Sequence, residues 1–319
     1  MAQPQQQPFD PGLTQQFTGR LRRTINKDGS FNVHRHGAGL RNANLYLWLI
    51  SMPWVWFVLL VLTAYGVVNI LFACIYYLIG VNQLAGVDTE NAQHAFLSCF
   101  FFSSHTLTTV GYGSIYPKGL AANSLASLEA LIGLLGFAVA TGLLYGRVSR
   151  PSARLAFSSH MLIAPYQGGE SLQFRIANRR VNIMIEIEAR VLLMTVVRQD
   201  GELKRNYVPL TLERPAVYFL PLTWTIVHAI DENSPLRGKT AADLEQLQAE
   251  FLVLIKGFDD TFSQTVHARN SYRYDEIVWN ARFTPSFSAD SNGDLVLELE
   301  RLSSYQSLPA ASAREALPQ

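Results

Sequence analysis

The chain has 319 residues, with 49% apolar residues, 16% charged residues and a formal net charge of +1. The near-neutral balance gives no sign of a nucleic-acid partner, and two cysteines, Cys74 and Cys99, form no disulfide framework and suit a reducing compartment. These averages do not demand a membrane protein, but the distribution of the charged residues along the chain does.

Residues 1–43 form a polar, proline-bearing and then basic N-terminal segment. It lacks the apolar core of a signal peptide, so no cleavable signal is expected. Its composition predicts a mostly extended or disordered cytoplasmic segment. His34 and His36 are either a metal-binding pair or solvated residues near a basic membrane edge, and the second interpretation is favoured.

Residues 44–151 are expected to form a transmembrane pore domain. No charged side chain occurs from Asn42 to Val87, and only Glu129 occurs from Gly119 to Gly146. A helix needs about 20 mainly apolar residues to cross the hydrocarbon, so each stretch suffices for one span. Basic residues flank the pair of spans, whereas their connection offers Lys118 alone. Both termini are therefore expected to be cytoplasmic.

The first span begins with a short aromatic segment that Pro53 ends. Because Tyr and Trp prefer the headgroup level, an interfacial helix is expected over 44–53. Pro53 then starts an outer helix over 54–79, since the first helical turn tolerates its missing N–H group. The alternative is one long tilted helix from Asn44 to Ile79.

Residues 92–107 are uncharged and aromatic but short for a span, which suits a re-entrant pore helix. Two glycines around an aromatic residue follow it. Glycine permits backbone conformations that a side chain forbids, so carbonyl groups can point the same way. Four such loops around an axis give rings of carbonyl oxygens that replace the water shell of K⁺. The predicted K⁺ selectivity filter, within 108–113, consists of Thr109, Val110, Gly111, Tyr112 and Gly113, with K⁺ held at the first four.

An inner helix is expected over 119–148. Its lone carboxylate, Glu129, either attracts cations below the filter or makes a buried hydrogen bond to the pore helix, with His105 as a partner; the bond is slightly favoured. Gly133 and other glycines recur along the helix, either for close packing or, at Gly133, as a gating hinge.

From residue 152 to residue 302 the pattern changes to period-two alternation with turn signals, which predicts a cytoplasmic β-sandwich. A short helix is expected over 240–248, and residues 303–319 form a C-terminal tail. The expected strands are 171–177, 184–197, 217–230, 250–257, 271–283 and 295–302.

Several catalytic signatures are absent from the sequence: Gly-x-Gly-x-x-Gly after a strand, Gly-x-Ser-x-Gly, His-Glu-x-x-His and Cys-x-x-Cys. His160, His228 and His267 are scattered and are interpreted as structural. We therefore expect no enzyme, no catalytic residue and no cofactor. No span carries arginine at every third position, so no voltage-sensor helix is expected.

Taken together, these motifs resemble those of the inward-rectifier potassium channels, in their prokaryotic (KirBac) branch. Thr-Leu-Thr-Thr-Val-Gly-Tyr-Gly, ending at Gly113, carries the filter, and Ala-Val-Ala-Thr-Gly-Leu-Leu-Tyr-Gly-Arg-Val-Ser-Arg-Pro, ending at Pro151, is similar to the inner-helix end and basic linker. In the soluble part, Thr-Trp-Thr-Ile-Val-His and Asp-Glu-Ile-Val-Trp are similar to family strands. The similarity extends from about Leu45 to Leu302.

The resemblance implies a homotetramer with an immunoglobulin-like cytoplasmic assembly. Tyr145 corresponds to the gate at the inner mouth, with a lipid-facing or packing tyrosine as the alternative, and Phe137 and Thr141 line the pore. Phe137 replaces the acid of strong rectifiers, which puts tight block by Mg²⁺ or polyamines in doubt, and His105 replaces a glutamate behind the filter. Anionic lipids would contact the basic linker at Arg147, Arg150 and Arg154.

The sequence thus predicts a tetrameric, passive, potassium-selective channel of the bacterial inner membrane, with lipid modulation through its cytoplasmic domain. A bacterial source is favoured because the cysteines that flank the filter in eukaryotic members are absent. A membrane-anchored, ligand-binding β-domain protein is the alternative, and a two-span anchored enzyme is disfavoured by the missing catalytic motifs.

Overall fold

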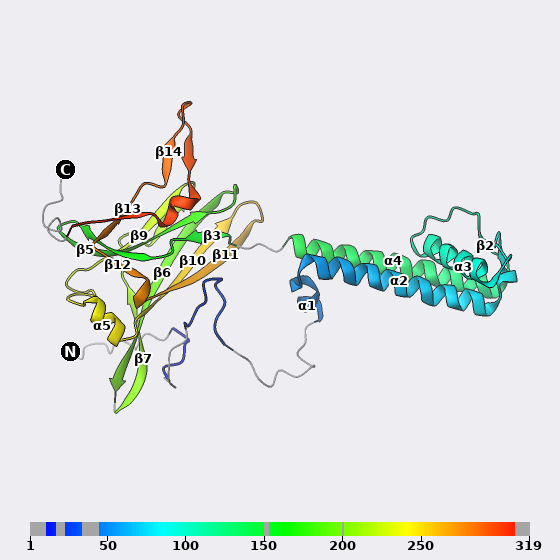
Figure 1. Cartoon of the computed structure of the whole chain (residues 1–319), viewed down its shortest axis with the longest axis horizontal. Coiled ribbons are helices and arrows are strands. Elements are labelled where there is room, and N and C mark those ends of the chain that lie inside the picture. The colour runs from blue at the N-terminus through cyan, green and yellow to red at the C-terminus, as the bar shows by residue number, and fades with distance from the viewer. Residues whose placement is uncertain (1–10, 17–22, 34–44, 150–152, 200, 310–319) are drawn as a thin grey trace, which may run out of the picture. The chain divides into compact units, whose positions relative to one another are not determined.

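The structure of the protein is a computed structural model that describes residues 11–16, 23–33, 45–149, 153–199 and 201–309. The chain divides into two compact units, residues 35–150 and residues 1–34 together with 151–319. Figure 1 shows that the first consists mainly of helices and the second mainly of strands. The expected membrane helices and all-β domain are therefore both present.

Two separate helices open the helical unit. Helix α1 spans Leu45–Ser51 and α2 spans Trp54–Ile79. Pro53 lies between them with φ −55° and ψ 149°, an extended conformation that interrupts the helix. The alternative of one continuous helix from Asn44 to Ile79 is therefore wrong.

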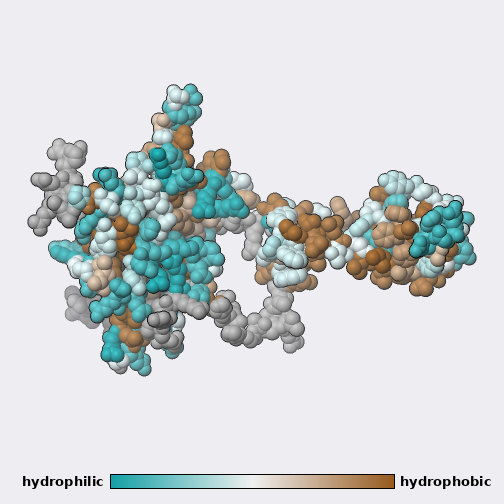
Figure 2. Space-filling model, in the orientation of Figure 1, coloured by the Kyte–Doolittle hydropathy of each residue, from teal (hydrophilic) through white to brown (hydrophobic). Residues whose placement is uncertain are grey.

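Helices α2 and α4 are long and apolar enough to cross a membrane. Helix α4 spans Leu120–Val148, and only 17% and 11% of the most apolar windows of α2 and α4 are buried within the chain. A core helix of a soluble protein would be mostly buried, whereas these helices leave apolar surface for lipid or for other chains. Figure 2 shows this apolar surface in brown over the helical unit.

Helix α3 spans Ala92–Leu107, and its 16 residues rise about 24 Å, less than the hydrocarbon thickness. It packs against α2 and α4 through a buried apolar cluster. Within this cluster the rings of Tyr76 and Phe102 meet edge to face with centroids 5.0 Å apart. The cluster consists of Phe72, Ala73, Tyr76, Leu84, Cys99, Phe102 and Ala122.

Short elements close the two connections around α3. The 3-10 helix η2 spans Val81–Gln83, and β1 at Leu84–Ala85 pairs antiparallel with β2 at Tyr116–Pro117. The pairing joins the segment before α3 to the segment after residue 113. It therefore holds together the two ends of the stretch that contains α3 and the predicted filter segment.

The second unit is a β-sandwich of two five-stranded sheets. One sheet has the order β11-β10-β6-β7 with β8 paired to β6, and the other has the order β12-β4-β5-β3 with β9 paired to β5. Inward-facing residues of both sheets form the main core, including Phe174, Ile176, Leu193 and Phe251. The sheets consist of β3 (Leu155–Phe157), β4 (Met161–Tyr166), β5 (Gly169–Asn178), β6 (Met184–Gln199), β7 (Glu202–Leu210), β8 (Ala216–Phe219), β9 (Thr223–Ala229), β10 (Glu250–Asp259), β11 (Gln264–Arg273) and β12 (Ile277–Trp279).

Smaller elements complete this unit. Helix α5 spans Ala241–Gln246, and the Thr240 side chain accepts a hydrogen bond from the Asp243 N–H group in a capping box, as expected for a helix in this region. The remaining elements are η3 (Tyr274–Glu276), β13 (Ala281–Phe283), β14 (Phe287–Ala289), β15 (Leu295–Leu297), η4 (Leu299–Ser303) and β16 (Tyr305–Ser307), with β13 paired to β16 and β14 to β15.

Several expected strands differ from those in the structure. The range 217–230 divides into β8 and β9, which belong to different sheets, since Pro221 lies between them and cannot donate to a strand ladder. The range 271–283 divides into the end of β11, η3, β12 and β13. Only 295–297 of the last expected strand is extended, and β16 lies in the range expected to be a tail. Strands β3, β4, β7 and β14 were not expected.

Residues 23–33 of the N-terminal segment form no helix or strand of their own, but they are attached to the β-sandwich, which the sequence did not indicate. Ile25 is 5% exposed and packs on the outer face of the β6, β7 and β10 sheet, beside Met194 and Leu252. The N–H and hydroxyl groups of Thr24 both donate to Glu250. One buried apolar residue and a few directed hydrogen bonds therefore order a polar segment. His34 and His36 lie outside the described residues.

Two charged groups add to this attachment. Arg23 and Lys27 both form ion pairs with Glu276, and the Lys27 ammonium lies 4.3 Å from the centroid of the Tyr272 ring. Burial lowers the pKa of Lys27, while Glu276 opposes that change.

His228 is a structural histidine, as its sequence context suggested. It is 4% exposed, its Nδ1 lies 2.7 Å from the Thr211 carbonyl oxygen, and its Nε2 lies 2.8 Å from Ser234 Oγ. Nδ1 therefore donates to the carbonyl group, and Nε2 accepts the hydroxyl proton. Burial lowers the pKa of His228 below its usual 6.5.

This lowered pKa predicts acid sensitivity. Below about pH 6.5 the unfolded chain binds a proton at His228 before the folded chain does, so the free energy of unfolding falls as the pH drops. We expect His228→Gln to show a smaller fall in thermal midpoint between pH 7.5 and 5.5 than the unchanged full-length chain, measured by circular dichroism. His267→Gln, which alters an exposed histidine, is the control and should retain the full fall. An equal fall in all three proteins would contradict the prediction.

Candidate functional site

The predicted filter segment follows α3 without a linker. Thr108 caps the helix, and the N–H groups of Val110 and Gly111 both donate to the His105 carbonyl oxygen, at 2.9 and 3.2 Å. The Thr109 N–H group donates to the Thr106 carbonyl oxygen at 3.0 Å. The last turn of α3 therefore fixes the direction in which the segment leaves the helix.

The backbone of the segment has positive φ at every second residue. The angles are 59° at Thr109, 55° at Gly111 and 80° at Gly113. In an ordinary strand successive carbonyl groups point to opposite sides, whereas alternation of left-handed and right-handed residues brings them to one side. This is the geometry that a carbonyl-lined ion path needs.

Conformation, rather than lack of space, accounts for the glycines. A Cβ atom added at Gly111 or Gly113 would meet no atom within 4 Å, yet positive φ is costly for residues with a side chain. Thr109 carries this cost, about 1–2 kcal/mol, in a β-branched residue. Strain of this kind is typical of functional segments that the surrounding structure holds in place.

His105 lies directly behind the segment. Its ring meets the Tyr112 ring edge to face, with centroids 4.9 Å apart and an interplanar angle of 90°. Together with the bonds to its carbonyl oxygen, this contact places His105 as a support of Tyr112. Its proposed bond to Glu129 is not among those that the described residues make.

Glu129 lies instead at the centre of a buried group of polar side chains from α2, α3 and α4. Glu129, Asn69 and Ser103 are fully buried, and Tyr76 is 1% exposed. The Tyr76 hydroxyl donates to Glu129 Oε2 at 2.7 Å, and Ser103 Oγ lies 2.5 Å from Glu129 Oε1. The bond to the pore helix expected from the sequence is therefore present, but Ser103 provides it.

The positions of the hydrogen atoms follow from the remaining distances. Ser103 Oγ lies 3.1 Å from Asn69 Oδ1, and the Asn69 amide nitrogen donates to the Tyr65 carbonyl oxygen at 2.7 Å, so Oδ1 must accept. Ser103 has one hydroxyl proton. Ser103 can donate that proton to Glu129 or to Asn69, so the two acceptor oxygens compete for it.

A close approach joins α4 to the end of α3. A Cβ atom added at Gly133 would lie 2.0 Å from the Leu107 carbonyl oxygen and 2.9 Å from the Leu107 carbonyl carbon. Glycine is needed here because the two backbones touch. This packing reason is independent of a hinge at Gly133, which stays a prediction.

The three inner-helix residues assigned to the pore and gate share one side of α4. Residues four apart on a helix are rotated by about 40°, so Phe137, Thr141 and Tyr145 follow one another along a stripe. All three are exposed in the single chain, Phe137 at 74% and Tyr145 at 73%. The stripe is available to line a path or to meet lipid.

Arg147 connects the end of α4 to the C-terminal end of α1 and the first turn of α2. Its guanidinium donates to the carbonyl oxygens of Leu49 and Met52 and lies 4.9 and 4.5 Å from the ring centroids of Trp54 and Phe57. A cation at the C-terminal end of α1 also stabilises that helix. The sequence suggested lipid contact but not this role.

Of the other two basic residues of the expected linker, only Arg154 lies within the described residues. Arg154 is exposed, and Arg150 lies outside the described residues. Sequence reasoning also missed Asn69, Tyr76 and Ser103, although polar side chains within apolar segments are a recognised functional signal.

Comparison with known proteins gives a consistent result over both units. The model of the inward rectifier potassium channel C-terminal domain matches residues 155–317, and an ion channel model matches residues 57–150. These two ranges cover the β-sandwich and the membrane helices in turn.

Similar proteins cover most of the chain. The inward rectifier potassium channel Kirbac3.1 of Paramagnetospirillum magnetotacticum is 39% identical over 284 residues, 88% of this chain and 94% of that protein. The G protein-activated inward rectifier potassium channel 3 of Mus musculus is 28% identical over 341 residues, 96% of this chain and 84% of that protein. A solved structure of Spo0M from Bacillus subtilis has 12% identity and a TM-score of 0.24 over 40% of this chain and 50% of that one, too low to support an argument.

The hydrogen bonds around Glu129 lead to a prediction. Glu129→Gln keeps a polar group of the same size at this position, so it should keep the thermal midpoint of the purified protein near its original value. Glu129→Ala leaves the buried Tyr76 hydroxyl without its partner, although Ser103 can still donate to Asn69, and it should lower stability by about 1–3 kcal/mol. Thermal unfolding measured by circular dichroism checks both variants. A Gln variant as unstable as the Ala variant would show that a polar group of this size does not suffice and that the carboxyl group itself is required.

The contact between Gly133 and Leu107 leads to a second prediction about stability. Gly133→Ala forces a methyl group against a backbone carbonyl, and we expect a loss of about 1–3 kcal/mol from overpacking. Gly136→Ala is the matched control, because a Cβ atom there meets no atom within 4 Å of the same chain, and alanine favours the helix. Thermal unfolding of the purified protein checks both. Equal midpoints for the two variants would show that α4 does not need glycine at 133.

Proposed function

The chain belongs to the inward rectifier potassium channel family, and we propose that four copies of it assemble into a passive, potassium-selective channel. Members of this family are ion channels and not enzymes, and K⁺ is the ion they transport. No covalent step is therefore required of this chain, and its task is to lower the cost of moving a dehydrated ion through the bilayer.

The alternating φ angles from Thr109 to Gly113 are the observation that carries the proposal. Four copies around an axis would present the carbonyl oxygens of Thr109, Val110, Gly111 and Tyr112, with the Thr109 hydroxyl forming the innermost ring. These oxygens replace the water around K⁺. In the single chain Val110 and Tyr112 are 52% and 75% exposed, which leaves them available to neighbouring copies.

A gate at the inner end of α4 completes the path. We assign Tyr145 to the narrowest point, with Phe137 and Thr141 lining the path between it and the filter. Bulky apolar side chains that converge on an axis can stop conduction by excluding water. Gly133 is the proposed hinge, since it lies where α4 touches the filter's supporting helix.

The bilayer supplies both the setting and the proposed regulation. We place the chain in a bacterial inner membrane with both termini and the β-sandwich in the cytoplasm, by the excess of basic residues outside the connection between the spans. Anionic lipid headgroups would attract Arg147, Arg150 and Arg154, each contributing about 1 kcal/mol. Because Arg147 also holds α1 and α2, lipid charge near it would bear on the position of the gate.

Replacement of Gly111 tests the filter assignment. Gly111→Asp places a side chain on a residue with φ of 55° and a charge beside the ion path, so we expect K⁺ flux into liposomes to fall to background while tetramers remain intact by size-exclusion chromatography. Gly201→Asp alters a glycine with φ of 83° in the turn between β6 and β7 and should retain flux. Undiminished flux in the Gly111 variant would remove the basis of the proposal.

The pore-lining assignment of Phe137 has its own test. Phe137→Asp would place four carboxylates around a low-dielectric path, where they attract multivalent cations. Internal spermine or Mg²⁺ should then block outward K⁺ current at least tenfold more strongly than in the unchanged channel, in patch recordings. Val139→Asp, about 200° around α4 from Phe137 and 62% exposed in the single chain, is the comparison and should give no such block. Recordings without added block would place Phe137 outside the pore.

A further inference from the structure

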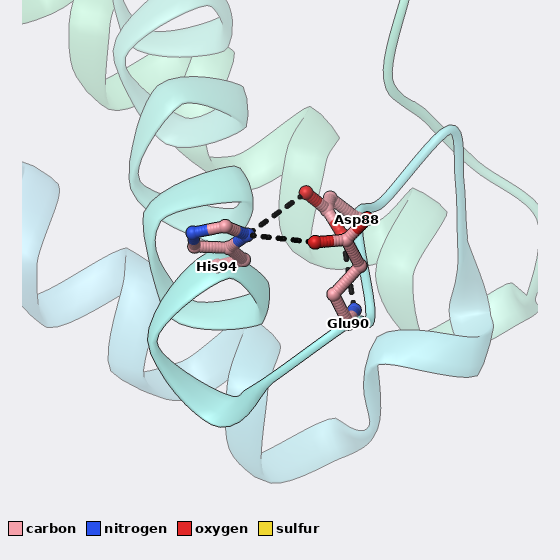
Figure 3. Close-up of side chains that lie close together, drawn as sticks. All are labelled: Asp88, Glu90 and His94. Atoms are coloured by element: carbon pink, nitrogen blue, oxygen red, sulfur yellow. Dashed lines mark hydrogen bonds and ion pairs between the residues drawn. The ribbon is translucent and has the colours of Figure 1, made fainter.

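Three metal-binding side chains meet where the connection after β1 enters α3. Asp88 and Glu90 lie in that connection, and His94 lies in the first turn of α3. Their ligand atoms all lie within 4.8 Å of one another, and all three side chains are exposed. Figure 3 shows the His94 ring turned so that one nitrogen faces both carboxylates.

The distances match those around a small divalent ion. Zn²⁺ binds nitrogen and oxygen at about 2.0–2.2 Å, which places two ligands of a tetrahedral site about 3.4 Å apart. His94 Nδ1 lies 3.1 Å from Asp88 Oδ2 and 3.8 Å from Glu90 Oε2. These two distances bracket the tetrahedral value, and all three ligand atoms lie within 4.8 Å of one another, so small side-chain rotations would bring them around one ion.

The ligands are also oriented before any ion arrives. The Glu90 N–H group donates to Asp88 Oδ1, and the Asp88 N–H group donates to Ser98 Oγ. The His94 N–H group donates to the side chain of Asn91, which caps α3. Asp88 Oδ2 and Glu90 Oε2, the oxygens nearest His94, are left for a cation.

The set of donor atoms selects the kind of cation. Ca²⁺ and Mg²⁺ prefer oxygen ligands alone, whereas an imidazole nitrogen with two carboxylates suits Zn²⁺ and similar transition metals, with water completing the coordination. Two carboxylates and a neutral imidazole carry two negative charges, which one divalent ion neutralises.

We propose that Asp88, Glu90 and His94 bind one divalent transition-metal ion per chain, of the Zn²⁺ type, at the filter end of the helical unit. The ion ties the connection after β1 to the first turn of the helix that supports the filter. This site is separate from the K⁺ path and does not depend on the proposed conduction.

Zinc binding to the purified full-length channel tests the proposal. Equilibrium dialysis with metal analysis should give one Zn²⁺ per chain, and His94→Gln and Asp88→Asn should each weaken binding at least tenfold. His267→Gln alters an exposed histidine of β11 and is the matched control that should bind as before. Potassium-dependent thermal stabilisation, measured in parallel, reports whether each variant still folds.

Two further measurements keep the outcome decisive. Glu90→Gln changes a side chain that is 80% exposed, so it should fold normally and still weaken binding. Visible absorption of the Co²⁺-loaded protein should show a four- or five-coordinate ion that the His94 variant lacks. Absent saturable Zn²⁺ binding, or binding that survives both His94→Gln and Glu90→Gln, would overturn the proposal. If Gly111→Asp loses K⁺ flux but still binds Zn²⁺, the metal-site proposal is supported independently of the proposed conduction.

Discussion

The helical unit depends on the requirement that no backbone polar group remain unpaired at membrane depth. The segment from Thr109 to Gly113 leaves helical geometry there, and its first N–H groups are satisfied by the last turn of α3, chiefly by the carbonyl oxygen of His105. The carbonyl groups of the segment are then free for an ion. The proposed filter thus continues directly from α3, and its geometry depends on the position of that helix.

Two kinds of contact hold α3 in place. The buried group around Glu129 joins it to α2 and α4 through hydroxyl and amide side chains, which hydrogen bonding makes directional. The touching backbones at Gly133 and Leu107 set the distance between α4 and the end of α3. The hydrogen bonds fix the orientation of α3, and the backbone contact fixes its distance from α4. A movement of α4 would therefore displace the end of α3 and the proposed filter that follows it.

The far end of α4 is held by a different device. Arg147 occupies the C-terminal end of α1 and stacks on two aromatic rings of α2. A lysine could supply the charge but not the paired bonds and the stacking. In the other unit, residues 23–33 are attached to the β-sandwich by Ile25 and by ion pairs to Glu276. Residues 23–33, which precede α1 in the sequence, therefore belong to the same compact unit as the β-sandwich that follows α4.

The membrane helices, and the positive-φ glycines of the segment proposed as the filter, could be predicted from the sequence because their signals are local. The bounds of α2 and α3 follow from runs of apolar residues, Pro53 and the polar residues that end them, and the glycines at 111 and 113 mark the backbone directly. The sandwich was harder, because strand pairing depends on partners far along the chain: β8 and β9 read as one alternating run, yet they belong to different sheets. The attachment of residues 23–33 was missed because it depends on partners more than 150 positions away: an apolar surface made by β6, β7 and β10 for Ile25, and the carboxylates of Glu250 and Glu276.

The amino-acid sequence by itself determined the family and the class of fold, and it located the segment proposed as the filter, since each rests on composition and spacing within a short stretch. Only the tertiary structure decided that Glu129 meets Ser103 and Tyr76 rather than His105, that Gly133 touches Leu107, and that Arg147 binds the end of α1. Those contacts join residues from 26 to 98 positions apart, and no local pattern specifies which polar groups will be buried together when three helices pack.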